Sequence, residues 1–317
     1  MKKVFILFLS LIFAFSLISC GNNSKVQYPS QEFWYEDGEL TVQTDYEYDE
    51  KGNVTKETVY YKDEGETELA LSYQIEYEYD EKGNLTTTYW KDPDENGNLV
   101  LSSRFEHKYE NNLEVRSESY ATFDEGDELI LTSYEDTTYD IATLTSHTLY
   151  YSISDDPKEF NLVIDTKTKY KDNFEDNVKL EEINEFYSDL NEIDSTSIYT
   201  YYYDEDGTYI GVDSNSGDYS YMITYTYDQN GNILTETEFD HDLESDEYTI
   251  DSVTNYLYDK DSKLISEYTT YGDESFPRLR KYIHEYDKNG NEIKETSYDY
   301  NVDTRLYEES FRIEYVY

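Results

Sequence analysis

The chain of 317 residues is strongly acidic, with 72 Asp and Glu against 25 Lys and Arg and a net charge of −47. Such a surface repels nucleic acid and anionic lipid head groups, because binding to phosphate needs basic patches that displace counterions. Yet 17% of the residues are aromatic, 39 of them Tyr, which excludes an ordinary acidic disordered chain.

The first 19 residues predict an export signal. A short basic start, Met1-Lys2-Lys3, precedes an apolar run over residues 4–17 that is too short to cross a bilayer as a helix. The run ends in LISC, which resembles the lipobox of bacterial lipoproteins. This resemblance implies cleavage before Cys20, the only cysteine, whose sulfur would carry the lipid. The alternative is an ordinary signal in which Cys20 is incidental.

Three segments follow from this signal. We expect a signal peptide over residues 1–19, a lipidated cysteine with a polar tether over residues 20–31, and a repeat domain over residues 32–317. The protein would be exported and attached by its lipid to the cell envelope, at the outer membrane or cell surface rather than the inner membrane. The excess of negative charge favours a monomer.

The repeat domain opens with a predicted β-hairpin, YEYDEKGNVTKETVYY, over residues 46–61. Alternating apolar and polar residues before the DEKG turn are typical of a half-buried strand, and the Thr, Val and Tyr after it favour a returning strand. Asp at the first turn position accepts hydrogen bonds from the backbone, and Gly at the fourth tolerates a left-handed conformation. Together these residues predict a type I turn with a bulge.

The same corner recurs about every 30 residues to the end of the chain, which identifies a repeat protein. Asp or Glu occupies the first turn position at 49, 80, 110, 140, 172, 204, 228, 259 and 287. The best-formed corners pair an Asp with a Gly three residues later: Asp49 and Gly52, Asp80 and Gly83, Asp204 and Gly207, Asp228 and Gly231, and Asp287 and Gly290.

The Tyr-x-Tyr-Asp-x-x-Gly corner is similar to the YD repeats of Rhs-type bacterial proteins. Its longer spacing resembles uncharacterised bacterial lipoproteins with a porin-like β fold. The sequence departs from the Rhs pattern in its spacing and in having Asn after the Gly, as at Asn53 and Asn84. Because of these departures, the resemblance to Rhs-type proteins does not imply a toxin function for this chain.

Some nine hairpins predict about eighteen strands, each with an aromatic and an acidic face. So many antiparallel strands exceed what an open twisted sheet tolerates. We expect an all-β protein whose long antiparallel meander curls into a large barrel or a barrel-like shell. An open, solenoid-like ribbon is the alternative. A membrane-spanning pore is a further alternative, although Lys and Glu occur on both faces of several outgoing strands, such as residues 55–60.

Residues 172–197 interrupt the strand pattern. Ile183, Phe186, Tyr187 and Leu190 follow helical spacing, but a degenerate repeat also accounts for them. We expect strands here.

The chain offers no conventional catalytic or metal-binding motif, and its four His are scattered. Residues 92–97, DPDENG, place Asp92, Asp94 and Asn96 as at the start of a calcium loop, but Ser103 stands where a bidentate Glu is needed. A plain turn accounts for the same residues, so we expect neither a metal nor another cofactor.

Three functional hypotheses remain. We favour a non-enzymatic binding or scaffold module of the cell envelope, which presents tyrosines to a glycan, a peptide or an envelope protein. An envelope glycan hydrolase that uses two carboxylates is the second hypothesis, with residues 167–197 as the candidate insertion. A membrane pore is the third.

Overall fold

The computed structural model describes residues 28–317, except 64, 123–127, 154–159, 172–177, 189–191, 218, 243–244, 246, 273–279 and 302–303. The described chain is all β and contains no helix. Accordingly, no apolar helix of membrane-spanning length occurs among these residues.

Twenty strands follow one another along the chain. They are β1 (Gln31–Glu36), β2 (Glu39–Tyr48), β3 (Val54–Tyr61), β4 (Ala70–Tyr79), β5 (Leu85–Pro93), β6 (Leu99–Glu110), β7 (Leu113–Ala121), β8 (Ile130–Asp140), β9 (Thr145–Ile153), β10 (Phe160–Tyr170), β11 (Lys179–Tyr187), β12 (Ile193–Tyr203), β13 (Tyr209–Asn215), β14 (Ser220–Tyr227), β15 (Ile233–Asp242), β16 (Glu247–Tyr258), β17 (Leu264–Tyr271), β18 (Arg280–Tyr286), β19 (Glu292–Asn301) and β20 (Leu306–Val316).

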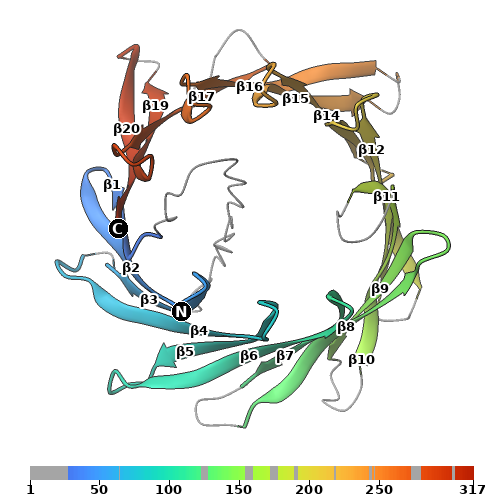
Figure 1. Ribbon diagram of the computed structural model, residues 1–317, viewed down its shortest axis with the longest axis horizontal. Helices are drawn as coiled ribbons and strands as arrows, with labels where there is room; N and C mark the ends of the chain where they lie inside the picture. The colour runs from blue at the N-terminus through green and yellow to red at the C-terminus, as the bar shows by residue number, and fades with distance from the viewer. Residues whose placement is uncertain are drawn as a thin grey trace.

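The strands form one closed antiparallel barrel (Figure 1). Each strand pairs with the next, and β1 also pairs with β20, with Gln31 opposite Val316 and Glu36 opposite Phe311. The predicted all-β barrel is confirmed, and the alternative of an open ribbon is wrong. Twenty strands replace the expected eighteen. Within the segment 172–197 the predicted strands are confirmed: residues 179–187 form β11, because neighbouring strands on both sides supply its backbone partners. Residues 172–177 and 189–191, including Leu190, lie outside the described residues.

The predicted corners are built around the aspartate side chain. In the turn at Asp80, the carboxylate accepts the backbone N–H groups of Lys82 and Asn84 at 2.8 and 2.9 Å, while Gly83 has a φ of 93°. The side chain of Asn84 donates to the other carboxylate oxygen at 2.8 Å. This last bond explains the Asn that follows the Gly. We call this arrangement the Asp turn.

At most of the corners, the tyrosine before the turn joins its hairpin to the preceding strands. The hydroxyl of Tyr79 donates to the carbonyl of Val54 at 2.9 Å, and Tyr286 donates likewise to Leu264 at 2.8 Å. The final residue repeats the bond, since Tyr317 donates to the carbonyl of Glu292 at 2.7 Å. The Tyr-Asp pair therefore stabilises both local and neighbouring structure: the Asp carboxylate closes its own turn, and the Tyr hydroxyl bonds to the neighbouring hairpin.

The register assigns strand residues to two faces. Successive side chains point to opposite sides, and cross-strand partners share a side. Glu57 lies opposite both Tyr46 and Ile75, while Trp34 lies opposite both Ile313 and Val42. One face therefore continues around the closed wall and returns to itself.

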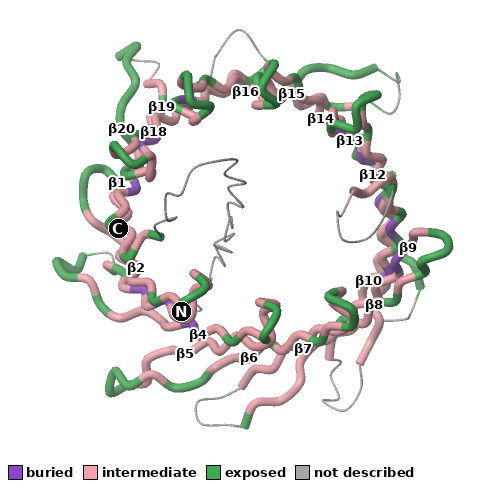
Figure 2. Tube along the Cα trace, viewed as in Figure 1, coloured by how far each residue is buried: buried purple, intermediate pink, exposed green. Residues whose placement is uncertain are grey.

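This Tyr-rich face is the inner face of the barrel. The four buried apolar side chains, Val59, Ile75, Val212 and Ile313, all belong to it by register. Burial also raises the pKa of Tyr46 most strongly on this face, as expected where a concave wall surrounds a side chain with protein. Figure 2 shows the buried positions spread along the wall instead of collected in a central core.

Candidate binding site in the barrel interior

Inner-face carboxylates near the closing strands are held by aromatic donors. Tyr46 donates to Glu32 at 2.7 Å, and the indole N–H of Trp34 also donates to Glu32. Tyr77 donates to Glu57 at 2.9 Å. Burial raises the pKa of Glu57 above its usual value, against the opposing effect of the Tyr77 bond. These acids are paired with neutral groups, so their charges are not cancelled locally.

A hydroxyl-lined pocket of about 270 Å³ lies across strands β7–β11. Thr137 and Thr148 bond to each other at 2.9 Å, and Thr166 donates to Asn184 at 2.6 Å. Ser146 and Tyr170 add further hydroxyls. The pocket residues are Glu114, Arg116, Ser117, Glu135, Thr137, Tyr139, Ser146, Thr148, Thr166, Thr168, Tyr170, Lys179 and Glu182.

Carboxylates accompany these hydroxyls in the pocket. Glu135 accepts a weak bond from Ser117 at 3.4 Å, and Glu182 pairs with Lys179 at 2.6 Å. Glu114 contacts His107 at 2.8 Å. Except for Arg116, the lining residues belong to the inner face or its margin by register. The pocket can therefore donate and accept many hydrogen bonds, with carboxylates as the strongest acceptors.

A second inner-face cluster surrounds His284. Its Nδ1 lies 2.7 Å from Glu292 Oε1 and 3.8 Å from Glu295 Oε2. Burial alone would lower the pKa of His284, but the bond to Glu292 and the surrounding carboxylate charges raise it above its usual value. Burial raises the pKa of Glu295, with the nearby charges of Glu292, Glu267 and Glu32 acting in the same direction.

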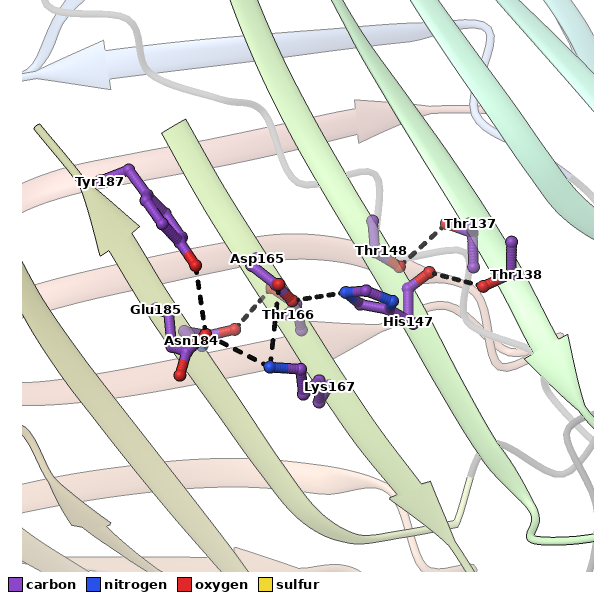
Figure 3. A network of polar contacts seen from close by, with 10 residues as sticks. All are labelled: Thr137, Thr138, His147, Thr148, Asp165, Thr166, Lys167, Asn184, Glu185 and Tyr187. Carbon is purple, nitrogen blue, oxygen red and sulfur yellow. Dashed lines mark hydrogen bonds and ion pairs between the residues drawn. The ribbon is translucent and has the colours of Figure 1, made fainter. Parts of the chain in front are cut away.

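The outer face carries most of the described ion pairs. Figure 3 views β9–β11 from outside, with the opposite wall behind them; Asp165 contacts His147 at 2.7 Å and Lys167 at 3.8 Å, and Lys167 reaches Glu185 at 3.2 Å. Similar pairs follow the outer wall at Lys56–Glu47, Lys91–Glu76, Arg104–Glu106, Lys108–Glu118, Arg116–Asp136, Lys294–Glu285 and Arg312–Glu314.

The corner residues found in the sequence lie at turns and not in the interior. Asp49, Asp80, Asp204, Asp228 and Asp287 each accept backbone N–H groups two and four residues ahead. Gly52, Gly83, Gly207, Gly231 and Gly290 all have positive φ. They shape the barrel without taking part in either inner-face cluster.

The calcium candidates also form an Asp turn. Asp94 accepts the N–H groups of Asn96 and Asn98 at 2.8 Å each, and Asp92 on β5 accepts the indole N–H of Trp90 at 3.0 Å. Each carboxylate thus has a partner within the protein. Cys20, the signal segment 1–19 and the tether up to residue 27 lie outside the described residues.

Sequence reasoning missed the His284 cluster, although the signal was present. Once the turn at Asp287 is predicted, pairing its two strands places His284 opposite Glu295. The pocket gave no comparable signal, because Thr and Ser occur on both faces of the barrel wall, as at Thr137 on the inner face and Thr226 on the outer face.

No protein-family model and no curated protein matches the sequence. A porin-like protein from Bacteroides uniformis is 14% identical, covering 92% of this chain and 98% of that chain with a TM-score of 0.31. One from Bacteroides vulgatus is 12% identical, covering 92% and 99% with a TM-score of 0.35. The TcdB2-TccC3-TEV crystal structure is 14% identical over 81% of this chain and 15% of that chain, with a TM-score of 0.26. Likenesses at these TM-scores carry no information on function.

Proposed function

We propose that the protein is a monomeric, non-enzymatic binding module of the cell envelope whose barrel interior receives a glycan. The pocket on β7–β11 carries this proposal. Sugar hydroxyls both donate and accept hydrogen bonds, as do the pocket hydroxyls of Thr137, Thr148 and Thr166, and carboxylates accept more. The volume of about 270 Å³ lies just below the roughly 300–1,000 Å³ of sites for drug-sized ligands, which suits one sugar ring of a larger chain.

The charged outer face favours a barrel in water over a membrane pore. A Lys or Arg that faces lipid costs about 2–4 kcal/mol at the bilayer midplane. Arg104, Lys167 and Arg312 are spread over much of the outer wall, each beside a carboxylate. Most outer register positions of β14–β17 are uncharged, for example at Thr237 and Leu257, but a bilayer would surround the whole barrel.

The lipid anchor is part of the proposal. Cys20→Ala should leave an unprocessed or soluble precursor, because a single thioether would hold the barrel at the envelope. Detergent phase partitioning of envelope fractions measures this. Recovery of the processed variant in the detergent phase would contradict anchoring through Cys20.

A glycan hydrolase is the second candidate. Burial raises the pKa of Glu236 as it does that of Glu57, which is the direction of shift required of a general acid. Turnover of a bound glycan that Glu236→Gln or Glu57→Gln abolishes would replace the binding proposal with this one.

The binding test uses residues 21–317 on arrayed glycans at low and high salt, followed by calorimetry with any glycan retained. Thr137→Val should weaken binding about tenfold. The change removes one hydroxyl, so the hydroxyl of Thr148 and the facing group of the glycan each lose a hydrogen-bond partner. Thr226→Val is the matched control, since Thr226 and Thr235 form the same cross-strand hydroxyl pair on the outer face at 2.6 Å.

Binding that survives high salt, falls in Thr137→Val and persists in Thr226→Val would support the interior site. Equal loss in both variants would assign the effect to barrel stability. Absence of any retained glycan at either salt concentration would contradict the proposal.

A further inference from the structure

The hairpin of β18 and β19 brings three metal-ligating side chains together on the inner face. His284 lies opposite Glu295 in the register, and Glu292 is the first residue of β19. One ligand atom from each of the three residues lies within 4.8 Å of the other two. Two ligands of a tetrahedral ion, each about 2.1 Å from the metal, are about 3.4 Å apart. The observed 2.7 and 3.8 Å bracket that separation.

The imidazole of His284 is enclosed and already turned toward the two carboxylates. Its side chain is only 10% exposed, and Nδ1 is the ring nitrogen that faces Glu292 and Glu295. An ion bound through Nδ1 would take the place of the hydrogen bond between His284 and Glu292. Within the described chain Nε2, on the other side of the ring, has no hydrogen-bond partner, so no protein group holds the ring in another orientation.

The local charge also favours a cation. Besides Glu292, the carboxylates of Glu267 and Glu32 act electrostatically on Glu295, and the imidazole of His284 acts in the opposite direction. On the outer face, by contrast, Lys or Arg pairs with carboxylates across neighbouring strands. A divalent ion would supply the positive charge that this part of the inner wall lacks.

We propose that His284, Glu292 and Glu295 bind a divalent first-row transition-metal ion such as Zn²⁺. One imidazole and two carboxylates suit such ions, and three protein ligands leave a fourth position open to water or a ligand. Calcium fits less well, because it is bound by six to eight oxygen atoms.

The ion would brace the barrel close to where it closes. Glu295 lies opposite Ile313 of β20, and Ile313 lies opposite Trp34 of β1. The backbone of Glu292 also accepts the hydroxyl of the last residue, Tyr317. Metal bound here would cross-link β18 to β19 beside the strands that join the two ends of the described chain.

Calorimetry on residues 21–317, stripped with a chelator and dialysed, tests the site directly. We expect one Zn²⁺ per chain bound well above the background of surface carboxylates, and a loss of affinity of about tenfold or more in Glu295→Gln. Glu292→Gln should weaken binding similarly while keeping an oxygen that can bond to His284. His107→Ala is the control, because His107 lies on the same face beside Glu114 alone at 2.8 Å.

Cobalt substitution provides a readout of geometry. Co²⁺ with nitrogen and oxygen ligands in a tetrahedral site should give visible absorption bands that His284→Gln removes and His107→Ala keeps, with circular dichroism confirming that both variants fold. No saturable Zn²⁺ site, or a stoichiometric site with the same affinity in Glu295→Gln and Glu292→Gln, would overturn the proposal.

Discussion

On the outer face of the barrel wall, carboxylates meet Lys and Arg across neighbouring strands, as in Lys294–Glu285 and Arg116–Asp136. On the inner face near the closing strands, carboxylates instead accept hydrogen bonds from tyrosine hydroxyls, as in Tyr77–Glu57 and Tyr46–Glu32. The outer acids are therefore paired with opposite charge in contact with water, where such pairs contribute little to stability. The inner acids keep their charge in a more enclosed setting, where a bound ligand or cation has more to gain.

The two faces also divide the aromatic contacts. Tyr73 and Trp90 stack at 4.4 Å on the inner face, while Tyr134 and Tyr151 stack at 4.8 Å on the outer face beneath Arg116. The inner pair adjoins the buried Ile75, opposite Trp90 in the register. The difference teaches that the apolar stability of this barrel resides on its concave side. Three paired changes and a pH profile test this division, and one further change tests the Asp turn.

The largest effect is expected for Trp90→Ala. Losing an inner aromatic side chain should lower the free energy of unfolding by about 3 kcal/mol. Tyr151→Ala, which removes half of the outer stack, should cost about 1 kcal/mol. Urea unfolding of both variants measures the contrast. Equal losses would mean that the two faces contribute alike.

Gly83→Val should lower the free energy of unfolding by about 1–2 kcal/mol, because a β-branched residue resists the φ of 93° found there. A Cβ at this position would meet no atom within 4 Å, so strain is the only cause. Gly83→Asn, which tolerates positive φ better, is the control. A melting temperature unchanged in Gly83→Val would show that the Asp turn does not need Gly.

Glu57→Gln should stabilise the protein at pH 7 by on the order of 1 kcal/mol, because it removes an enclosed charge and keeps an acceptor for Tyr77. Outer Glu76→Gln, which loses its pair with Lys91, should have little effect. Melting temperatures at pH 7 compare the two. A lower value for Glu57→Gln would mean that the inner charge stabilises the fold.

The shifted pKa values of inner-face and turn carboxylates predict how the stability of the protein depends on pH. The pKa of folded Glu57 is raised above its usual value of 4.5, so its contribution to stability is fully present below that pH and is lost as the pH rises through the folded pKa. The pKa of Asp80 is lowered below 3.8 by its turn hydrogen bonds, so its contribution is lost as the pH falls through the folded value. Stability should therefore peak in mild acid, and Glu57→Gln should reduce its decline toward neutral pH.

The smallest effect is expected for Tyr79→Phe, which removes one hydroxyl bond to the carbonyl of Val54 and should cost about 1 kcal/mol. Tyr89→Phe is the matched outer change, since Tyr89 bonds to exposed Glu78 at 3.3 Å and should cost almost nothing. Thermal melts distinguish the two. Equal melting temperatures would show that the bond between hairpins does not contribute to stability.

The turns and the strand alternation of this fold could be predicted from residues close in sequence. The Asp turn at Asp49 needs only Lys51, Gly52 and Asn53, all within four positions, so its form follows from short-range hydrogen bonding. Strand alternation could be predicted for the same reason. The strand predicted around Ile183 is confirmed against the helical spacing, because Ile183 and Phe186 lie on opposite faces of a strand whose neighbours decide its conformation.

Closure and the contents of the interior could not be predicted this way. Gln31 and Val316 pair across almost the whole described chain, and no local pattern specifies that contact. The pocket likewise combines five strands, so its hydroxyls are indistinguishable in sequence from those of the outer wall.

The sequence by itself determined the repeat, its turns, the alternation of faces and the acidic charge, because each arises from residue type and short-range geometry. Only the tertiary structure decided that the wall closes, that its Tyr-rich face is concave, and that His284 meets Glu292 and Glu295 in an enclosed setting. The physical reason is curvature. A flat sheet would expose both faces equally, whereas a closed wall surrounds one face with protein and leaves the other in water.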